Sequence, residues 1–254
     1  MGSWGNTDIP TLHDYLCIIA KIFRKFKGFF CKGRPGRALY FFPVLRYDEI
    51  RNRKEGSRVA KLYFKYGAMG SSKSAQALIT KFNYEELGMT VWLIKPSVDT
   101  RDGKSAIRSR IGLQQEADAI PPECDLAERY HQMAPRDVII ADECQFFTPA
   151  QIDQLRSLVD EDDIPVLCFG LRTDFLTHLF PGSARLFEVA DSITEIKTVC
   201  ACGAKATVNA RIDGEGRVIT AGEQVFLGGN DSYVAMCHRC WKRAIREKKP
   251  VLRP

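Results

Sequence analysis

The sequence lacks any long hydrophobic run. No window of its 254 residues approaches the roughly 18–20 consecutive apolar residues that a membrane-spanning helix requires. A secretory signal is missing as well, because the apolar stretch 16–20 is short and continues directly into basic residues without a small-residue cleavage site. These absences predict a cytoplasmic protein without stable membrane association.

There is little excess charge beyond the first 58 residues. The net charge is +6, but residues 1–58 hold 12 Lys and Arg against 5 Asp and Glu, whereas residues 59–254 hold 25 against 26. A near-neutral body argues against nucleic-acid binding. Residues 1–58 are expected to form a basic, poorly ordered N-terminal extension. The alternative is a short basic amphipathic helix for a membrane surface or a partner.

Histidines are few, only four, whereas the nine cysteines are unevenly spread. Two close pairs stand near the C-terminus, and their members are Cys200, Cys202, Cys237 and Cys240. In a cytoplasmic protein such pairs are more often a metal site than disulfides. Four thiolates suit tetrahedral Zn²⁺ and leave no open position, so a structural zinc is expected. The alternative is a set of unligated thiols.

Apolar runs alternate with helical periodicity along residues 59–190. Strands are expected at 59–66, 90–94, 137–141 and 165–169, with helices at 74–87 and 148–160. This alternation predicts an α/β fold whose parallel sheet is covered on both faces. After about residue 191, short strands and glycine-rich turns suggest a small second domain. The expected boundaries are 1–58 for the extension, 59–192 for a nucleotide-binding domain, 193–245 for a zinc-binding domain and 246–254 for a basic tail.

One loop fits the phosphate-binding pattern G-x-x-x-x-G-K-[ST] with a single exception. Lys73 would reach the β- and γ-phosphates of a nucleotide, and Ser74 would bind Mg²⁺. Ser72 replaces the second glycine, and a left-handed backbone at that position would cost a serine about 1 kcal/mol. The residues of the loop are Gly67, Ala68, Met69, Gly70, Ser71, Ser72, Lys73 and Ser74. A glycine- and serine-rich turn before an ordinary helix is the alternative.

Two carboxylates end the expected strand 137–141. Asp142 is predicted to hold Mg²⁺ through water beside the phosphate loop, as in a Walker B element. Glu143 would then be available to accept the proton of an attacking hydroxyl. Two solvated acids at a strand end are the alternative. The loop and the pair support each other, because phosphoryl transfer from ATP needs both.

Several further segments occur in the order found in one enzyme family. The run Asp142-Glu143-Cys144-Gln145-Phe146-Phe147 resembles the D-E-[AC]-Q-F-F signature of the type II thymidine kinases. Segments 95–101, 109–113, 170–175 and 228–233 agree with that family, as do the four cysteines. The resemblance extends from about residue 60 to about residue 244. It implies a Rossmann-like P-loop domain and a small zinc-ribbon domain with a lasso loop.

The resemblance also implies roles for individual residues. The catalytic base falls on Glu143, and Arg101 would stabilise the transferring phosphoryl group. The positions that contact ATP fall on the phosphate loop and on Asp99, Thr100, Asp142 and Gln145. Those for the nucleoside fall on Met69, Phe146, Leu171, Phe175, Phe180 and Tyr233, and on the lasso residues Gln224, Val225, Phe226, Leu227 and Gly228. Ordinary core packing is the alternative for the apolar members.

The implied function is ATP- and Mg²⁺-dependent phosphorylation of thymidine at its 5′-hydroxyl, by a homo-oligomer that in this family is a tetramer. Three other functions fit parts of the sequence. They are an NTPase that uses the loop for hydrolysis, a zinc-ribbon nucleic-acid binding module, and a degenerate kinase retained as a binding protein. The choice of thymidine over deoxyuridine is left open by the sequence.

Overall fold

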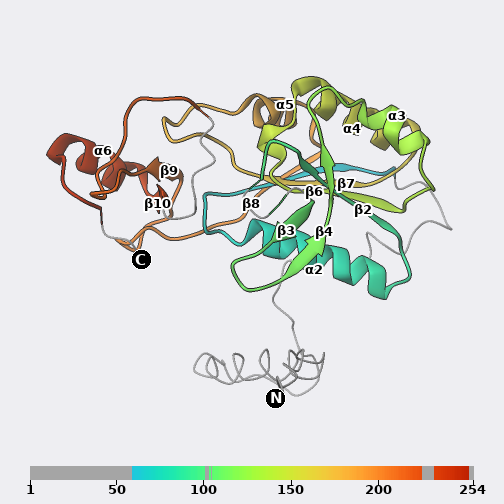
Figure 1. The fold of residues 1–254 in the computed structure, drawn as a ribbon, viewed down its shortest axis with the longest axis horizontal. Helices are drawn as coiled ribbons and strands as arrows, with labels where there is room; N and C mark the ends of the chain where they lie inside the picture. Colours follow the sequence, from blue (N-terminus) through green and yellow to red (C-terminus); the bar gives the residue numbers. More distant parts are fainter. Residues whose placement is uncertain (1–58, 101–102, 104, 225–231, 252–254) are drawn as a thin grey trace, which may run out of the picture. The chain divides into compact units, whose positions relative to one another are not determined.

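The computed structural model describes residues 59–100, 103, 105–224 and 232–251. Its main sheet has six strands in the order β5-β2-β6-β7-β1-β8 (Figure 1). Their bounds are β1 (Leu62–Tyr66), β2 (Val91–Pro96), β5 (Asp118–Ile120), β6 (Val138–Ala141), β7 (Val166–Gly170) and β8 (Ser192–Glu195). All neighbouring pairs are parallel. The predicted α/β fold with a parallel sheet is therefore confirmed.

Helices cover both faces of this sheet. Helix α2 (Lys73–Glu86) packs against β2, β6 and β7, while α4 (Pro149–Glu161) and α5 (Pro181–Val189) pack against β1. Figure 1 shows α2 on the face opposite α4, α5 and the short helix α3 (Leu126–His131). Every residue of β6 and β7 is buried, as continuous apolar runs between two helical layers should be.

The start of α4 matches its sequence pattern closely. The Thr148 hydroxyl accepts from the Gln151 backbone N–H at 3.1 Å, and Gln151 Oε1 accepts from the Thr148 backbone N–H at 3.2 Å. This capping box, with Pro149 at the first helical position, ends the loop that follows β6. It thereby fixes the length of the segment that carries the acidic pair.

The parallel arrangement brings three strand ends to one edge of the sheet. Tyr66 of β1 pairs with Gly170 of β7, and Ala141 of β6 pairs with Cys168 of β7. Loops that follow β1, β6 and β7 consequently leave the sheet side by side. In sheets of this kind ligands bind beyond the carboxyl ends of the strands.

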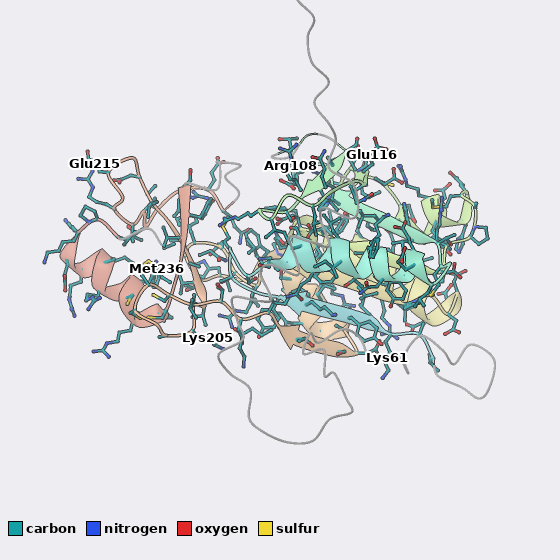
Figure 2. The ribbon with its side chains drawn as sticks, turned by 90° about the horizontal axis from the view of Figure 1, so that it is seen from below. Lys61, Arg108, Glu116, Lys205, Glu215 and Met236 are labelled. Carbon is teal, nitrogen blue, oxygen red and sulfur yellow. The ribbon has the colours of Figure 1, made fainter. Side chains whose placement is uncertain are left out.

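Two smaller elements stand apart from the main sheet. A hairpin of β3 (Ala106–Arg108) and β4 (Gln114–Glu116) follows β2. A C-terminal lobe is built from β9 (Val208–Arg211), β10 (Tyr233–Met236) and α6 (His238–Glu247). Figure 2 shows side-chain sulfur atoms beside α6 and Met236 in this lobe. The predicted boundary at 192–193 falls inside β8, and that at 245–246 falls inside α6.

No described helix is a candidate for a membrane span. None of the helices in the described ranges is both long enough and apolar enough to cross a bilayer.

Candidate active site

The loop after β1 wraps around the first turn of α2. The Lys73 ammonium donates to the carbonyl oxygens of Gly67 at 3.1 Å and Ala68 at 3.0 Å, so this cation lies inside the loop. Ser72 is the N-cap residue of α2 and has φ 61° and ψ 29°. The left-handed backbone expected at the position of the missing glycine is thus present. Backbone N–H groups at such a helix start form an anion site.

Gly67 is required by close packing. A Cβ atom placed on it would lie 2.4 Å from the carbonyl oxygen of Ile196, which is a clash with backbone. Ile196 N donates to the Tyr66 carbonyl at 2.6 Å, so the chain leaving β8 holds the start of the loop. A second, weaker contact joins Thr198 Oγ1 to the Gly70 carbonyl at 3.5 Å.

Asp142 is buried at the end of β6. Strand β7 lies between β6 and β1, yet the Ser74 side chain at the start of α2 is near enough to lower the pKa of Asp142. Burial, and then the neighbouring Glu143 carboxylate, raise the pKa of Asp142 to about 7, against the lowering effect of Ser74 and Lys73. Its Oδ1 atom is buried without a hydrogen-bond partner. A buried carboxylate oxygen beside a hydroxyl is a set of oxygen ligands that suits Mg²⁺.

Glu143 lies at the entrance to the same site in a strained backbone conformation. Its φ of 49° and ψ of 36° fall in the left-handed region, which non-glycine residues adopt at a cost of order 1–3 kcal/mol. Gln145 Nε2 donates to Glu143 Oε2 at 2.5 Å, while Gln145 Oε1 accepts from Leu171 N at 2.8 Å. A Cβ atom on Gly170 would lie 2.6 Å from that same Oε1. Close packing therefore fixes the amide that orients Glu143.

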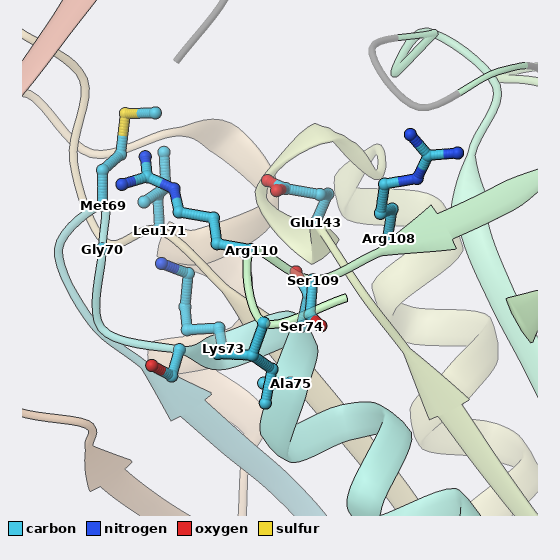
Figure 3. A pocket seen from close by; sticks show the side chains of 12 residues that line it. Met69, Gly70, Lys73, Ser74, Ala75, Arg108, Ser109, Arg110, Glu143 and Leu171 are labelled. Carbon is cyan, nitrogen blue, oxygen red and sulfur yellow. The ribbon is translucent and has the colours of Figure 1, made fainter. Parts of the chain in front are cut away.

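A pocket of about 190 Å³ is bordered by both the phosphate loop and Glu143 (Figure 3). Lys73, Ser74 and Glu143 line it, together with Met69 and Leu171. Residues of the β3–β4 hairpin also line the pocket, and these are Arg108, Ser109, Arg110 and Ile111. The sequence predicts no individual role for them and shows the run 109–113 only as a motif. In Figure 3 the Arg110 side chain extends over Lys73 toward Leu171.

Aromatic side chains gather around the loop that follows β7. Phe146 and Phe180 meet edge to face, with ring centroids 5.5 Å apart. Phe175 is buried, and the guanidinium of Arg211 from β9 lies 3.9 Å from its ring centroid. Arg211 also donates to the Tyr233 hydroxyl at 2.9 Å. The structure thus connects Phe175 and Tyr233, which are expected to contact the nucleoside, through an arginine that belongs to no sequence motif.

Gln224 and Asp99, two predicted ligand-binding residues, both pair with other side chains of the protein. Gln224 Nε2 donates to Asp174 Oδ2 at 3.0 Å, which ties the start of the lasso to the loop after β7. Asp99 is buried 3.6 Å from Lys95 Nζ and lies outside the pocket lining, while Thr100 is exposed. The predicted roles of Arg101 and of residues 225–228 fall on positions outside the described residues.

The four C-terminal cysteines converge. Their Sγ atoms all lie within 4.8 Å of one another, and Cys202 and Cys237 are 3.7 Å apart. In a tetrahedral site with metal–sulfur bonds of about 2.3 Å, neighbouring sulfurs lie about 3.8 Å apart. Cys237 also caps α6, accepting from Cys240 N at 3.4 Å. The cluster therefore has the ligand number and spacing of a closed metal site.

Comparison with known proteins covers most of the chain beyond residue 59. A family model described as thymidine kinase matches residues 60–241. A thymidine kinase of Idiomarina loihiensis is 45% identical over 191 residues, which are 74% of this chain and 98% of that protein. One from Yersinia pseudotuberculosis is 45% identical over 191 residues, 74% and 97% of the two chains. One from Novosphingobium aromaticivorans is 46% identical over 190 residues, 74% and 99% of the two chains.

Proposed function

The chain belongs to the thymidine kinase family, and we propose that it transfers the γ-phosphoryl group of ATP to the 5′-hydroxyl of thymidine. The observation that carries the proposal is that the phosphate loop and the carboxylate of Glu143 line one pocket. The Lys73 ammonium and the Glu143 carboxylate, which are the proposed phosphate-binding cation and the proposed base, therefore border one small space. That is the arrangement that phosphoryl transfer to an alcohol requires.

Each polar group has a role in this reaction. The N–H groups of the loop and Lys73 bind the β- and γ-phosphates. Ser74 and Asp142 would hold Mg²⁺, which would neutralise charge on the phosphoryl group. Glu143 accepts the proton of the 5′-hydroxyl as the new P–O bond forms. Gln145 orients that carboxylate through its 2.5 Å hydrogen bond.

The nucleoside is proposed to bind between the phosphate loop and the loop after β7. Met69 and Leu171 line the pocket there, and the buried Phe175 lies under the guanidinium of Arg211. Apolar and aromatic walls of this kind suit a flat pyrimidine ring. Phe146, Phe180 and Tyr233 would extend the wall. Arg101 would add a second cation on the phosphates, and the lasso residues 224–228 would bind the base through backbone groups.

Zinc is proposed as the metal of the cysteine cluster. Four thiols with sulfur spacings near those of a tetrahedral site support it, because Zn²⁺ prefers this ligand set and needs no open position in a structural role. A cytoplasmic location, where free thiols persist, belongs to the same proposal. So does assembly into a homo-tetramer, which rests on the family resemblance.

A coupled assay of ADP formation, with and without thymidine, tests the function. We expect ATP consumption to depend on thymidine and to yield thymidine monophosphate in equal amount. Deoxyuridine, measured in parallel, determines how strongly the 5-methyl group is preferred. Hydrolysis of ATP at the same rate without any nucleoside would instead identify an NTPase. No turnover together with retained ATP binding would identify a degenerate kinase.

A further inference from the structure

Asn209, on strand β9 of the C-terminal lobe, lies between two segments of the active site. Its Oδ1 accepts from Met69 N, in the phosphate loop, at 2.8 Å. Its Nδ2 donates to the Thr173 carbonyl, in the loop after β7, at 2.9 Å. The side chain is 3% exposed, so water does not compete for these bonds. One amide therefore spans the two loops that face the pocket.

The two partners of Asn209 are backbone atoms close to pocket residues. Met69 itself lines the pocket, and Thr173 lies two residues from Leu171, which also lines it. The Asn209 amide therefore sets the spacing between the phosphate side and the proposed nucleoside side. A shift of either loop would stretch one of two buried hydrogen bonds, and a buried polar group left without a partner is costly.

Asn209 is in turn held by the rest of the C-terminal lobe, which carries the cysteine cluster. It pairs with Ala235 in the β9–β10 ladder, and Cys237 of the cysteine cluster directly follows β10. Thr207 N, just before β9, also donates to the Met236 carbonyl at 2.9 Å. Backbone pairing between β9 and β10 thus connects the thiol cluster to the Asn209 side chain, which is hydrogen-bonded to the phosphate loop.

We propose that Asn209 is a positioning residue that couples the C-terminal lobe to the phosphate loop. It touches no reacting atom, and its effect is to keep Met69 and Thr173 at the separation that the two bound substrates need. The inference builds on the proposed function, because the spacing matters most when ATP and a nucleoside must meet. The part that concerns ATP alone can be tested independently of the nucleoside.

The test compares Asn209→Ala and Asn209→Asp with wild type. Alanine removes both bonds, whereas aspartate keeps an acceptor for Met69 N and places a second oxygen against the Thr173 carbonyl. Asp213→Ala is the matched control, because Asp213 caps a turn of the same lobe through Glu215 N and Arg217 N and lies outside the pocket lining. Each variant is assayed for bound metal, thermal unfolding, ATP affinity with a fluorescent ATP analogue, and kcat and KM.

We expect Asn209→Ala to retain its metal and to lose about tenfold or more in kcat/KM for both substrates, with weaker binding of the analogue. Asn209→Asp should retain more affinity for the analogue than Asn209→Ala but be similarly impaired toward thymidine. Asp213→Ala should lower the unfolding temperature without changing kcat/KM. If Asn209→Ala fails to fold, a loss of about tenfold or more in kcat/KM for thymidine in Asn209→Asp decides the matter.

Two results would overturn the inference. One is wild-type kinetics and analogue affinity in both Asn209 variants. The other is an equal loss in Asp213→Ala, which would mean that general weakening of the lobe is responsible. Should the wild-type protein not phosphorylate thymidine at all, the proposed function fails. The affinities for the ATP analogue would still decide whether Asn209 positions the phosphate loop.

Discussion

Gln145 Nε2 lies 2.5 Å from Glu143 Oε2, and the other end of the same amide accepts from the backbone N–H of Leu171. Gln145 is 1% exposed, so both bonds form away from water. The Glu143 carboxylate is therefore connected through Gln145 to the loop after β7, where Leu171 forms part of the apolar pocket wall. The orientation of the proposed base and the position of that wall depend on one side chain.

Replacing Gln145 with leucine should separate positioning from binding. The change removes both hydrogen bonds at similar volume and leaves the buried Leu171 N–H without an acceptor, which costs about 1–3 kcal/mol of stability. We expect kcat to fall about 10- to 100-fold, with a smaller change in KM for ATP, because the phosphate loop is untouched. Steady-state kinetics and urea unfolding measure the two effects.

Gln132→Leu is the control for this change, since Gln132 is exposed at the end of α3. It should leave kcat unaltered. If Gln145→Leu changed kcat less than twofold, Gln145 would not orient the base.

Glu143→Gln removes the proposed proton acceptor while keeping the size of the side chain. General bases contribute about 10²- to 10⁴-fold to a rate, so kcat should fall by that range. The affinity for ATP should be almost unaltered, because Lys73 and the loop N–H groups are in place. Rapid-quench measurement of a single turnover reports the chemical step directly.

Glu161→Gln, at the C-terminus of α4, is the matched control and should behave like wild type. Turnover by Glu143→Gln within a few-fold of wild type would assign the base to another group.

Much of this site could be predicted from local sequence. The phosphate loop was visible because its residues are contiguous and their spacing reflects a strand-to-helix turn. Its left-handed Ser72 was foreseeable because that position normally holds glycine. The thiol cluster was foreseeable from residue type and spacing, since two close pairs of cysteines are a common pattern of metal ligands.

Other parts of the site could not be predicted, because they depend on contacts between distant segments. The left-handed backbone of Glu143 has no glycine to indicate it. Arg110 reaches the pocket only because a hairpin folds beside the phosphate loop. Arg211 and Asn209 come from a strand that carries no motif, and their contacts with Phe175, Met69 and Thr173 span 36 or more positions. Sequence spacing carries no signal for such pairs.

The metal cluster should be essential to the C-terminal lobe. The buried core of this lobe is small, consisting of Cys200, Ala206, Ala210, Ile212, Val234, Met236 and Cys237. So few apolar side chains supply little hydrophobic stabilisation, and metal binding must provide much of the remainder. We expect Cys202→Ser to lose bound metal and to unfold at a lower temperature than wild type. Elemental analysis and calorimetry measure both.

Cys124→Ser is the comparison for that variant, because Cys124 is a half-buried thiol far from the cluster in sequence and outside it. It should keep its metal. Full metal content in Cys202→Ser would remove Cys202 from the ligand set.

Ser72→Gly should stabilise the protein. Ser72 has φ 61°, a region that costs a serine about 1 kcal/mol and glycine almost nothing. Its side chain makes no capping bond to α2, so little is lost when it is removed. We expect the free energy of unfolding to rise by about 0.5–1 kcal/mol and KM for ATP to stay equal or fall. Ser72→Ala removes the same hydroxyl but keeps the strained backbone, so it should bring no such gain. Equal stabilities of the glycine and alanine variants would show that backbone strain at this position is negligible.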